Sequence, residues 1–497
     1  MPNLGSDAPT RNRRRLWLSL ISCAAAIELL FICGFFLPLR MDRVPPSLDT
    51  NLARVYGLDA VGMLLYLAVV AGLLGAYAFA LRIAWHVPRA FIPRAILASA
   101  VFMATLVWIH PTYSSDVMHY VATARVAYVH GENPHVVPPE AISDDPLMQL
   151  SGWRALPSPY GAGWSWLGAV PFVMSGGLET AARSVVAFKL LAVACTLGAV
   201  AGVTVAAERL RAGAGPVAAV AFGWNPLIVI HFAGDGHNDA AMLLCLAWGI
   251  VALVTERRAA AVLLFAAATL IKPAAGLALL MLVVLLLHAR DIRALTVGVG
   301  TAALLAIVLY LPLWDGPRVI RPMLEEGGYF TNTPASLVRH GIAWRTSNAA
   351  SERVVGAGVR AVLLVAALLL AWRSRDDVAD FVLRIGVAYL LAVVLLGTWY
   401  QPWYVSWPLL FLSVALVADR SRVWLIVGLT AGGLLVPAAT NFVAAMAGRP
   451  AEDVVIDALA VLLVLAPLGM ALLAMRWQKA HGPKIHRHVL SPPVKTI

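Results

Sequence analysis

Charged residues are scarce in this sequence. Asp, Glu, Lys and Arg make up 13% of its 497 residues, whereas hydrophobic residues make up 60%. A soluble globular protein keeps about a quarter of its residues charged, so this composition excludes an ordinary soluble domain. Apolar runs of about 20 residues recur along the chain, and each is long enough to cross a hydrocarbon layer about 30 Å thick. We therefore expect an integral membrane protein.

Cysteines and ligand-binding motifs are also few. All four cysteines lie in apolar runs, which favours buried side chains over a disulfide set or a metal site. The histidines around His130 and His135 lack the spacing of metal ligands, so we expect no metal and no cofactor. The sequence has no DxD motif, Walker loop or helix-opening GxGxxG, which counts against a nucleotide substrate. The cysteines are Cys23, Cys33, Cys195 and Cys245.

The apolar runs predict an all-α polytopic membrane protein. The first run follows RNRRR and is too long for the apolar core of a signal peptide, so we expect the N-terminus in the cytoplasm. Alternating spans place the basic loops ERLR, HARDIR and ADRSR in the cytoplasm too, as the positive-inside rule requires. Orientation thereby accounts for the net charge of +11, and we expect no nucleic acid partner. About fourteen spans are expected, near 16–38, 59–83, 94–110, 181–207, 214–232, 237–255, 258–272, 274–289, 293–313, 356–373, 380–398, 403–418, 422–441 and 453–475.

One apolar segment, 160–177, is left out of this count. Counting it as a span would place ERLR outside and reverse the charge pattern of the later loops. We expect it to be an interfacial or re-entrant helix with Trp164 and Trp166 at head-group depth. The predicted organisation is a single transmembrane domain at 1–476, with external loops at 111–180 and 314–355, followed by a cytoplasmic basic tail at 477–497.

Polar residues collect on the non-cytoplasmic face of this predicted topology. Asp116 and Tyr120 begin the first long loop, and GDGHND (234–239) forms a tight turn. Charged groups near hydrocarbon are costly and usually functional. Lys189 is interpreted as a span-start anchor, which leaves Lys272, before a helix-breaking proline, as the candidate anion-binding lysine. The candidate site residues are Asp116, Tyr120, Tyr160, His237, Asn238, Asp239, Lys272, Trp399, Tyr400, Trp403 and Tyr404.

Each of these features also has a structural interpretation. Ser114 or Ser115 could cap the next helix, with Asp116 placed at the positive end of its dipole. Asp235, in the tight turn, could cap the helix that follows it. Lys272 could extend to a lipid head group, and the aromatic residues of TWYQPWY could form an interfacial belt.

Transfer of a sugar from a lipid phosphate at the outer leaflet would give these groups a common purpose. Such a reaction needs a base for the proton of the acceptor hydroxyl, and Asp116 could serve as one. It also needs groups that stabilise negative charge on the departing phosphate, which His237 and Lys272 could do, with Asn238 as a neutral donor. Attack from the opposite face of the anomeric carbon would be a single inverting displacement.

Five segments, taken in order, resemble a known family. They are SSDVMHYVATARVAYVHGENPH, LPSPYGAGWSWL, WNPLIVIHFAGDGHNDAAML, IKPAAGLALL and TWYQPWYVSWPL, and together they cover roughly 110–410. In this order they are similar to the actinobacterial-type polyprenol-phosphate-mannose-dependent α-1,6-mannosyltransferases of the GT-C superfamily. The resemblance implies a GT-C type helical bundle, Asp116 as catalytic base, a polyprenyl-phosphate sugar donor, an inverting reaction and no required metal. It maps the family's His-Asn-Asp and Lys-Pro motifs onto 237–239 and 272–273.

We therefore expect a hexosyltransferase of the bacterial cytoplasmic membrane. It would move a sugar, expected to be mannose, from a polyprenyl phosphate to a hydroxyl of an extracytoplasmic glycan or glycolipid, with membrane lipids around it. Two alternatives remain: a transporter or flippase for lipid-linked saccharides, and a scaffold or sensor without catalysis. Transporters usually show repeated halves and polar groups near the membrane midplane. The sequence shows no matching halves, and its polar groups gather at one end.

Overall fold

The computed structural model describes residues 8–44, 46–47, 52–325, 329–374, 377–450 and 453–481. Within these ranges the chain forms helices and three isolated β-bridges but no strand, which confirms the all-α class. Residues 482–497 of the expected basic tail lie outside the described part.

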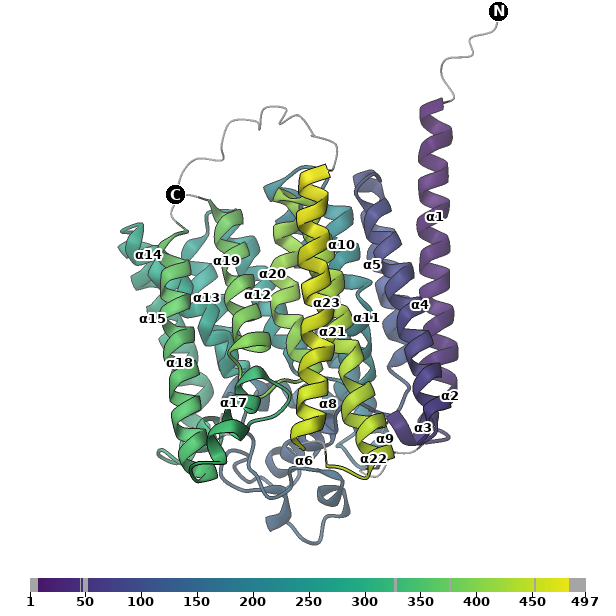
Figure 1. The fold of residues 1–497 in the computed structure, drawn as a ribbon. Coiled ribbons are helices and arrows are strands. Elements are labelled where there is room, and N and C mark those ends of the chain that lie inside the picture. The colour runs from purple at the N-terminus through teal and green to yellow at the C-terminus, as the bar shows by residue number, and fades with distance from the viewer. Residues whose placement is uncertain are drawn as a thin grey trace, which may run out of the picture.

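The first half of the chain builds one edge and the centre of a helical bundle. In Figure 1, α1 stands at the edge and α4, α5 and α10 follow it inward. The helices are α1 (Ala8–Phe31), η1 (Ile32–Phe36), α2 (Leu37–Leu39), α3 (Leu52–Tyr56), α4 (Ala60–Ala84), η2 (Arg89–Phe91), α5 (Ile92–Leu106), α6 (Asp116–Tyr128), η3 (Pro139–Ala141), η4 (Pro146–Leu150), α7 (Ala162–Leu167), α8 (Ala169–Met174), α9 (Ala181–Leu210), α10 (Gly215–Gly223), α11 (Pro226–Val229) and η5 (Ile230–Gly234).

The second half completes the bundle, with α14, α15 and α18 at the edge away from α1 (Figure 1). The short helices α6, α8 and α17 gather with their loops at the end opposite the N-terminus. The remaining helices are α12 (Asp239–Val254), α13 (Arg258–Ile271), η6 (Pro273–Ala275), α14 (Gly276–His288), α15 (Ile292–Tyr310), η7 (Leu311–Leu313), α16 (Arg321–Glu325), α17 (Pro334–Ala343), α18 (Asn348–Trp372), α19 (Val378–Leu390), η9 (Leu391–Leu395), η10 (Pro402–Val405), α20 (Ser406–Ala415), η11 (Leu416–Ala418), η12 (Arg420–Arg422), α21 (Val423–Pro437), η13 (Ala438–Val443), α22 (Ala444–Ala447) and α23 (Val454–His481).

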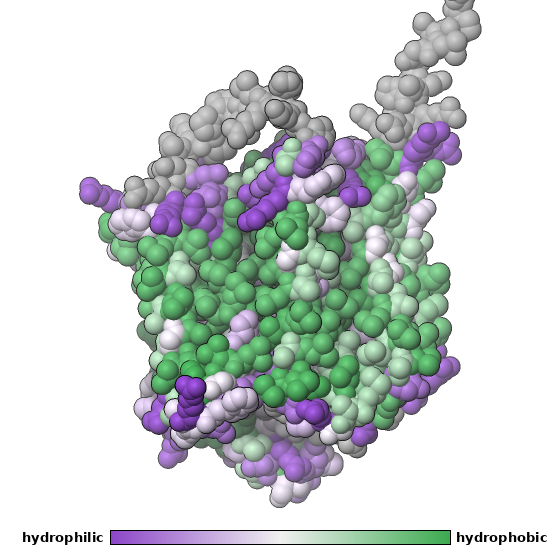
Figure 2. All heavy atoms as spheres, in the orientation of Figure 1, coloured by the Kyte–Doolittle hydropathy of each residue, from purple (hydrophilic) through white to green (hydrophobic). Residues whose placement is uncertain are grey.

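The bundle is that of a multi-pass membrane protein. Figure 2 shows a broad apolar band around its middle, bounded by polar residues at both ends. Nine helices of the described chain are long and apolar enough to cross a membrane, and a tenth span is formed if Gly215–Gly223 and Pro226–Gly234, bent by 51°, count as one. The nine are Arg14–Leu39, Ala60–Ala84, Arg89–Leu106, Ala181–Leu210, Ile292–Leu313, Asn348–Trp372, Val378–Leu395, Arg420–Ala447 and Val454–His481.

The prediction of about fourteen spans is therefore wrong. Four of the expected spans are shorter apolar helices of 10–17 residues: Asp239–Val254, Arg258–Ile271, Pro273–His288 and Pro402–Ala418. At 1.5 Å per residue, a 16-residue helix is about 24 Å long, less than the hydrocarbon thickness. The GDGHND turn and Pro273 interrupt the apolar runs. Hydropathy alone does not distinguish such helices from spans. Helix α12 is as apolar as a span, although it packs between α9 and α13.

The apolar segment 160–177 behaves only partly as expected. It forms the two short helices α7 and α8, and neither is a candidate span. Trp166 is 40% exposed, but Trp164 is only 3% exposed. Trp164 does not face lipid, because its ring packs against Tyr120 and Phe188 inside the bundle.

Candidate active site

The loop between α5 and α6 carries Asp116 and is tied to three neighbouring elements. The backbone of His110 donates to the carbonyl of Leu39 (2.6 Å). The carboxylate of Asp235 accepts hydrogen bonds from the backbone N–H groups of Thr112 (2.9 Å) and Tyr113 (3.3 Å). These contacts fix the point at which α6 begins, and hence the position of Asp116.

Lys189 also holds this loop. Its ammonium is fully buried and donates to the backbone carbonyl of Ile109. The interpretation of Lys189 as a span-start anchor is therefore wrong, since an anchoring lysine would extend to the head groups. The lysine and the carboxylate of Asp235 act on the same short stretch of chain from two different elements.

Asp116 is the first residue of α6. Its backbone N–H donates to Ser114 Oγ (3.0 Å), whereas Ser115 makes no side-chain capping bond. The carboxylate itself is 15% exposed and lies 3.6 Å from Nδ1 of the fully buried His237. A position in the first turn favours negative charge, but it leaves the carboxylate oxygens available to a ligand. Capping and catalysis by Asp116 are thus compatible.

The charge state of Asp116 follows from its neighbours. Burial raises the pKa of this carboxyl, but His237 and Lys272 favour the charged form and outweigh burial, so its pKa lies below the ordinary value. In His119, one turn further along α6, burial favours the neutral form instead and lowers the pKa to about 4. At neutral pH Asp116 is therefore ionised, and the imidazole of His119 is uncharged.

His237 has an unusual environment for a buried polar side chain. Its ring stacks on Trp403 with centroids 4.0 Å apart and an interplanar angle of 20°. Within the described part of the chain neither ring nitrogen has a hydrogen-bond partner, and the same is true of Asn238 Nδ2. Buried polar atoms are nearly always satisfied, so these groups mark a place where a polar ligand could bind.

Lys272 lies at the end of α13, deep in the same region. Its Nζ pairs with Asp239 Oδ2 (2.9 Å) and donates to Asn238 Oδ1 (3.4 Å). Trp407 Nε1 donates to the other oxygen of Asp239 (2.6 Å). The lysine is 5% exposed, so the alternative that it extends to a lipid head group is wrong.

Aromatic rings surround the ammonium of Lys272. It lies 5.1 Å from the ring centroid of Tyr404 and 5.7 Å from those of Tyr160 and Trp407. Such rings attract a cation and exclude water. Because Asp239 already pairs with Lys272, an anionic ligand at this position would have to share the positive charge of the lysine with Asp239.

A cavity of about 90 Å³ opens beside these groups. One wall is aromatic: the ring centroids of Tyr329 and Trp399 are 4.8 Å apart, and Trp153 lies 5.8 Å and 6.3 Å from them. Apolar rings of this kind suit the faces of a sugar. The lining residues are Asp116, His119, Trp153, Leu156, Pro157, Pro159, Tyr160, Pro322, Tyr329, Trp399 and Tyr404.

The other predicted aromatic residues are buried in the bundle near the cavity. Tyr120 accepts a hydrogen bond from the backbone N–H of Asn238 (3.4 Å). Tyr400 and Trp403 are 1% and 4% exposed, and Tyr404 is 9% exposed. The alternative that these three form an interfacial belt is wrong, because belt residues lie at the membrane surface.

The structure also brings His231, which the sequence analysis did not single out, beside two residues that it did. His231, Asp235 and His237 offer ligand atoms within 4.8 Å of one another, so they could hold a metal ion. Both oxygens of Asp235 already accept hydrogen bonds, one of them from His231 Nδ1 (2.9 Å). We therefore assign this carboxylate to positioning the loop before α6.

Comparison with known proteins identifies a family of similar proteins. Residues 25–288 match the family model described as the N-terminal domain of alpha-(1->6)-mannopyranosyltransferase, and residues 344–468 match one described as the MptB C-terminal domain. Alpha-(1->6)-mannopyranosyltransferase A of Mycobacterium tuberculosis is 27% identical over 403 residues, which cover 76% of this chain and 75% of the relative.

Two further relatives match over shorter stretches. A protein of Mycolicibacterium smegmatis, named as a probable alpha-(1->6)-mannopyranosyltransferase, is 31% identical over 137 residues, or 27% of this chain and 24% of the relative. Alpha-(1->6)-mannopyranosyltransferase A of Corynebacterium glutamicum is 27% identical over 155 residues, or 31% of this chain and 30% of the relative.

Proposed function

This chain belongs to the α-(1→6)-mannopyranosyltransferase family of membrane proteins, and we propose that it transfers mannose from a polyprenyl-phosphate donor to a hydroxyl of a glycan or glycolipid. The observation that carries the proposal is the position of the Asp116 carboxylate on the wall of a cavity, 3.6 Å from His237. Lys272 lies in the same cluster through Asn238 and Asp239. These contacts support the proposal because they place a candidate base and candidate phosphate-binding groups at one end of the bundle.

Asp116 acts as the general base in this proposal. Its carboxylate accepts the proton of the acceptor hydroxyl as that oxygen attacks the anomeric carbon of the donor. The bond between the anomeric carbon and the phosphate oxygen breaks, and the electron pair leaves with the polyprenyl phosphate. One displacement of this kind inverts the anomeric configuration. The lowered pKa of Asp116 keeps its carboxylate ionised at neutral pH and able to accept a proton, and it also makes this carboxylate a weaker base than a free aspartate.

The departing phosphate needs groups that meet its growing negative charge. His237 and Asn238 have unsatisfied nitrogen atoms within the described chain, and Lys272 supplies the positive charge. Preorganised donors are worth most where water is excluded, and the rings around Lys272 exclude it. The aromatic wall formed by Trp153, Tyr329 and Trp399 would hold a sugar ring beside Asp116.

We also propose that the active site faces away from the cytoplasm, with both chain termini inside. The support is the distribution of charge: Arg209, Arg211 and Arg420 lie at helix ends on the side of the bundle away from Asp116. Cytoplasmic ends of bacterial membrane proteins carry an excess of Lys and Arg. The membrane would be the bacterial cytoplasmic membrane, with a lipid-linked donor in its outer leaflet.

The test is sugar transfer by purified protein. Radiolabelled polyprenyl-phosphate mannose and an oligomannoside acceptor are supplied to the wild type, to Asp116→Asn and to Asp144→Asn. Asp144 is exposed in the loop after α6 and does not line the cavity, so it provides a matched control. Loss of a general base should lower the rate by about 10²–10⁴-fold in Asp116→Asn alone.

Each outcome has a clear meaning. Equal transfer by Asp116→Asn and the wild type would remove the aspartate from the mechanism. Transfer by none of the proteins, in folded and donor-binding samples, would reject mannose or the chosen acceptor. Movement of the labelled donor across a vesicle membrane without transfer would instead support the transporter alternative.

A further inference from the structure

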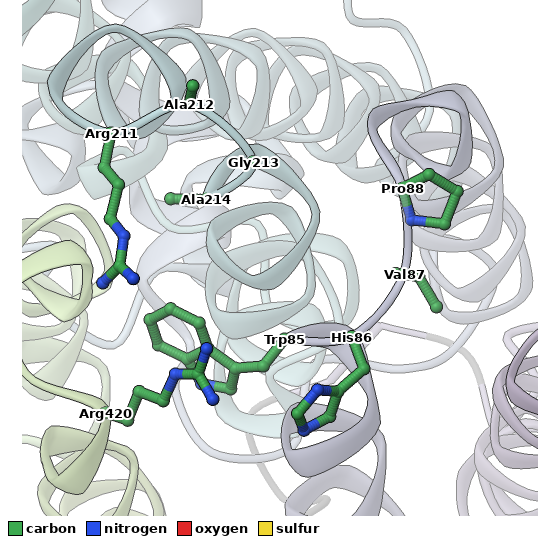
Figure 3. Close-up of a pocket in the computed structure, with 9 residues that line it drawn as sticks. All are labelled: Trp85, His86, Val87, Pro88, Arg211, Ala212, Gly213, Ala214 and Arg420. Atoms are coloured by element: carbon green, nitrogen blue, oxygen red, sulfur yellow. The ribbon is translucent and has the colours of Figure 1, made fainter. Parts of the chain in front are cut away.

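A second and larger cavity lies at the opposite end of the bundle. Its volume is about 320 Å³, and Figure 3 shows its lining. Helix α5 begins beside this cavity and ends at the loop that carries Asp116, so the two cavities face opposite membrane surfaces. The lining residues are Trp85, His86, Val87, Pro88, Arg211, Ala212, Gly213, Ala214 and Arg420.

The cavity is strongly basic. Arg211 and Arg420 both line it, His86 is a third basic residue, and none of the nine lining residues is acidic. Among the residues that the structure describes, no carboxylate lies within 4.0 Å of either guanidinium. Two guanidinium groups held near one another repel unless an anion lies between them.

The carboxylates close in sequence to the two arginines, Glu208 and Asp419, have other partners. Glu208 pairs with Arg89 and accepts hydrogen bonds from the backbone N–H groups of Gly213 (2.6 Å) and Gly215 (2.7 Å). Asp419, next to Arg420, pairs with Lys479 (2.9 Å). The charge of the two cavity arginines is therefore left for a ligand.

The two arginines are held in place by the same tryptophan. The guanidinium carbon of Arg420 lies 4.9 Å from the ring centroid of Trp85, and that of Arg211 lies 6.0 Å from it. Arg211 also donates to the carbonyl of Val417 (2.9 Å). In Figure 3 the two side chains approach Trp85 from different elements. Each guanidinium has five N–H donors, so most of them remain available.

The indole nitrogen of Trp85 gives a second indication of a missing ligand. Nε1 is buried and has no acceptor within the described part of the chain. A buried donor without an acceptor is uncommon in folded proteins. An oxygen atom bound between the arginines and the tryptophan would satisfy it.

The depth of the cavity identifies the source of the anion. Trp85 follows the last residue of the span Ala60–Ala84, Arg211 follows the last residue of Ala181–Leu210, and Arg420 begins the span Arg420–Ala447. Span ends lie at head-group level, where lipid phosphates are concentrated. Guanidinium groups bind phosphate oxygens in pairs. We propose that this cavity binds the phosphate of an anionic lipid head group in the leaflet opposite the Asp116 site.

The experiment measures lipid retention by the full-length protein purified in detergent. Native mass spectrometry counts bound phosphatidylglycerol in the wild type and in the double variant Arg211→Gln/Arg420→Gln. The control is Arg94→Gln, because Arg94 also stacks on a tryptophan at this end of the bundle (4.4 Å to the Trp17 centroid) but does not line the cavity. The double variant should bind at least about tenfold more weakly, and the control should bind like the wild type.

Competition on the wild type tests the ligand without any substitution. Added phosphatidylglycerol should displace the phosphatidylglycerol already bound at the site, whereas phosphatidylcholine and inorganic phosphate at the same concentration should not. Equal retention by the wild type and the double variant would overturn the proposal. Equal competition by phosphatidylcholine would overturn its anionic character, and equal competition by inorganic phosphate would overturn the lipid as source. None of these readouts depends on sugar transfer, so they stand apart from the proposed function.

Discussion

At the scale of single residues, the contact between Asp116 and His237 determines how the site should respond to pH. Burial raises the pKa of Asp116, but the combined lowering by His237 and Lys272 is larger. The net pKa is therefore below that of a free carboxyl. A carboxyl with a lowered pKa loses its charge only as the pH falls through that lowered value. Sugar transfer by the wild type should therefore show no acid limb from Asp116 at or above the pKa of a free carboxyl.

Replacing His237 should move that limb. His237→Phe keeps a ring that can stack on Trp403 but removes the nitrogen that faces the carboxylate. Without His237, less remains to offset the effect of burial, so the pKa of Asp116 rises. The acid limb of kcat should shift to higher pH, and kcat itself should fall because a proposed phosphate-binding group is lost. A pH profile that is lower in rate but unshifted would show that His237 does not act on Asp116.

The pair of Lys272 and Asp239 needs a double variant. Lys272→Met alone leaves the carboxylate of Asp239 buried without its partner, which typically costs about 3–5 kcal/mol of stability. Lys272→Met/Asp239→Asn removes both charges and should recover most of the unfolding temperature in detergent. We expect this double variant to bind the polyprenyl-phosphate donor at least about tenfold more weakly than the wild type.

The control for that experiment is Asp239→Asn with Lys272 intact. It leaves the buried lysine without its carboxylate, so it should lose stability as Lys272→Met does, but protein that remains folded should keep donor binding. Donor affinity equal to that of the wild type in the folded double variant would remove Lys272 from phosphate binding and leave it a structural ion pair.

At the scale of elements, Asp235 connects the turn after η5 to the loop before α6. Asp235→Ala removes the acceptor of the Thr112 and Tyr113 N–H groups, which typically costs about 1–3 kcal/mol. Hydrogen exchange at residues 110–116 should become faster, and kcat should fall by about 10- to 100-fold with a smaller change in donor KM. Unchanged exchange in this segment would show that the contacts from Lys189 and Leu39 position the loop without Asp235.

The sequence predicted the elements of the site better than the contacts between them. The motifs around Asp116, His237 and Lys272 stand out locally because polar residues interrupt apolar runs. Trp407 gave no such signal: it lies in an apolar helix, and its partner Asp239 is 168 residues away. The role of His231 was hidden in the same way, since a histidine in an apolar run is as compatible with simple burial as with a hydrogen bond to Asp235.

At the scale of the whole molecule, the membrane class and the gathering of polar groups at one end were predictable, whereas the number of spans was not. The runs at 237–255, 258–272, 274–289 and 403–418 are as apolar as true spans, yet their helices are shorter. A helix surrounded by other helices need not match the membrane thickness, because protein rather than lipid covers its ends. Only tertiary packing distinguishes the two cases.

The proposed orientation can be tested on whole cells with single cysteines. Ser143→Cys places a thiol in the exposed loop after α6, and Ala212→Cys places one in the exposed turn after α9, at the other end of the bundle. A membrane-impermeant maleimide should label Ser143→Cys on intact cells and Ala212→Cys only after the membrane is opened. The unsubstituted protein measures the background from its own four cysteines.

The reverse labelling pattern would place Asp116 in the cytoplasm. The lipid-linked donor would then have to be used from the inner leaflet, and the basic cavity around Arg211 and Arg420 would face the outside. Labelling of both variants on intact cells would mean that the reagent enters through the protein or a damaged membrane, and a control thiol in a cytoplasmic protein separates these causes. The expected pattern leaves arginine-rich helix ends inside, where the positive-inside rule places them, and the carboxylate of Asp116 outside.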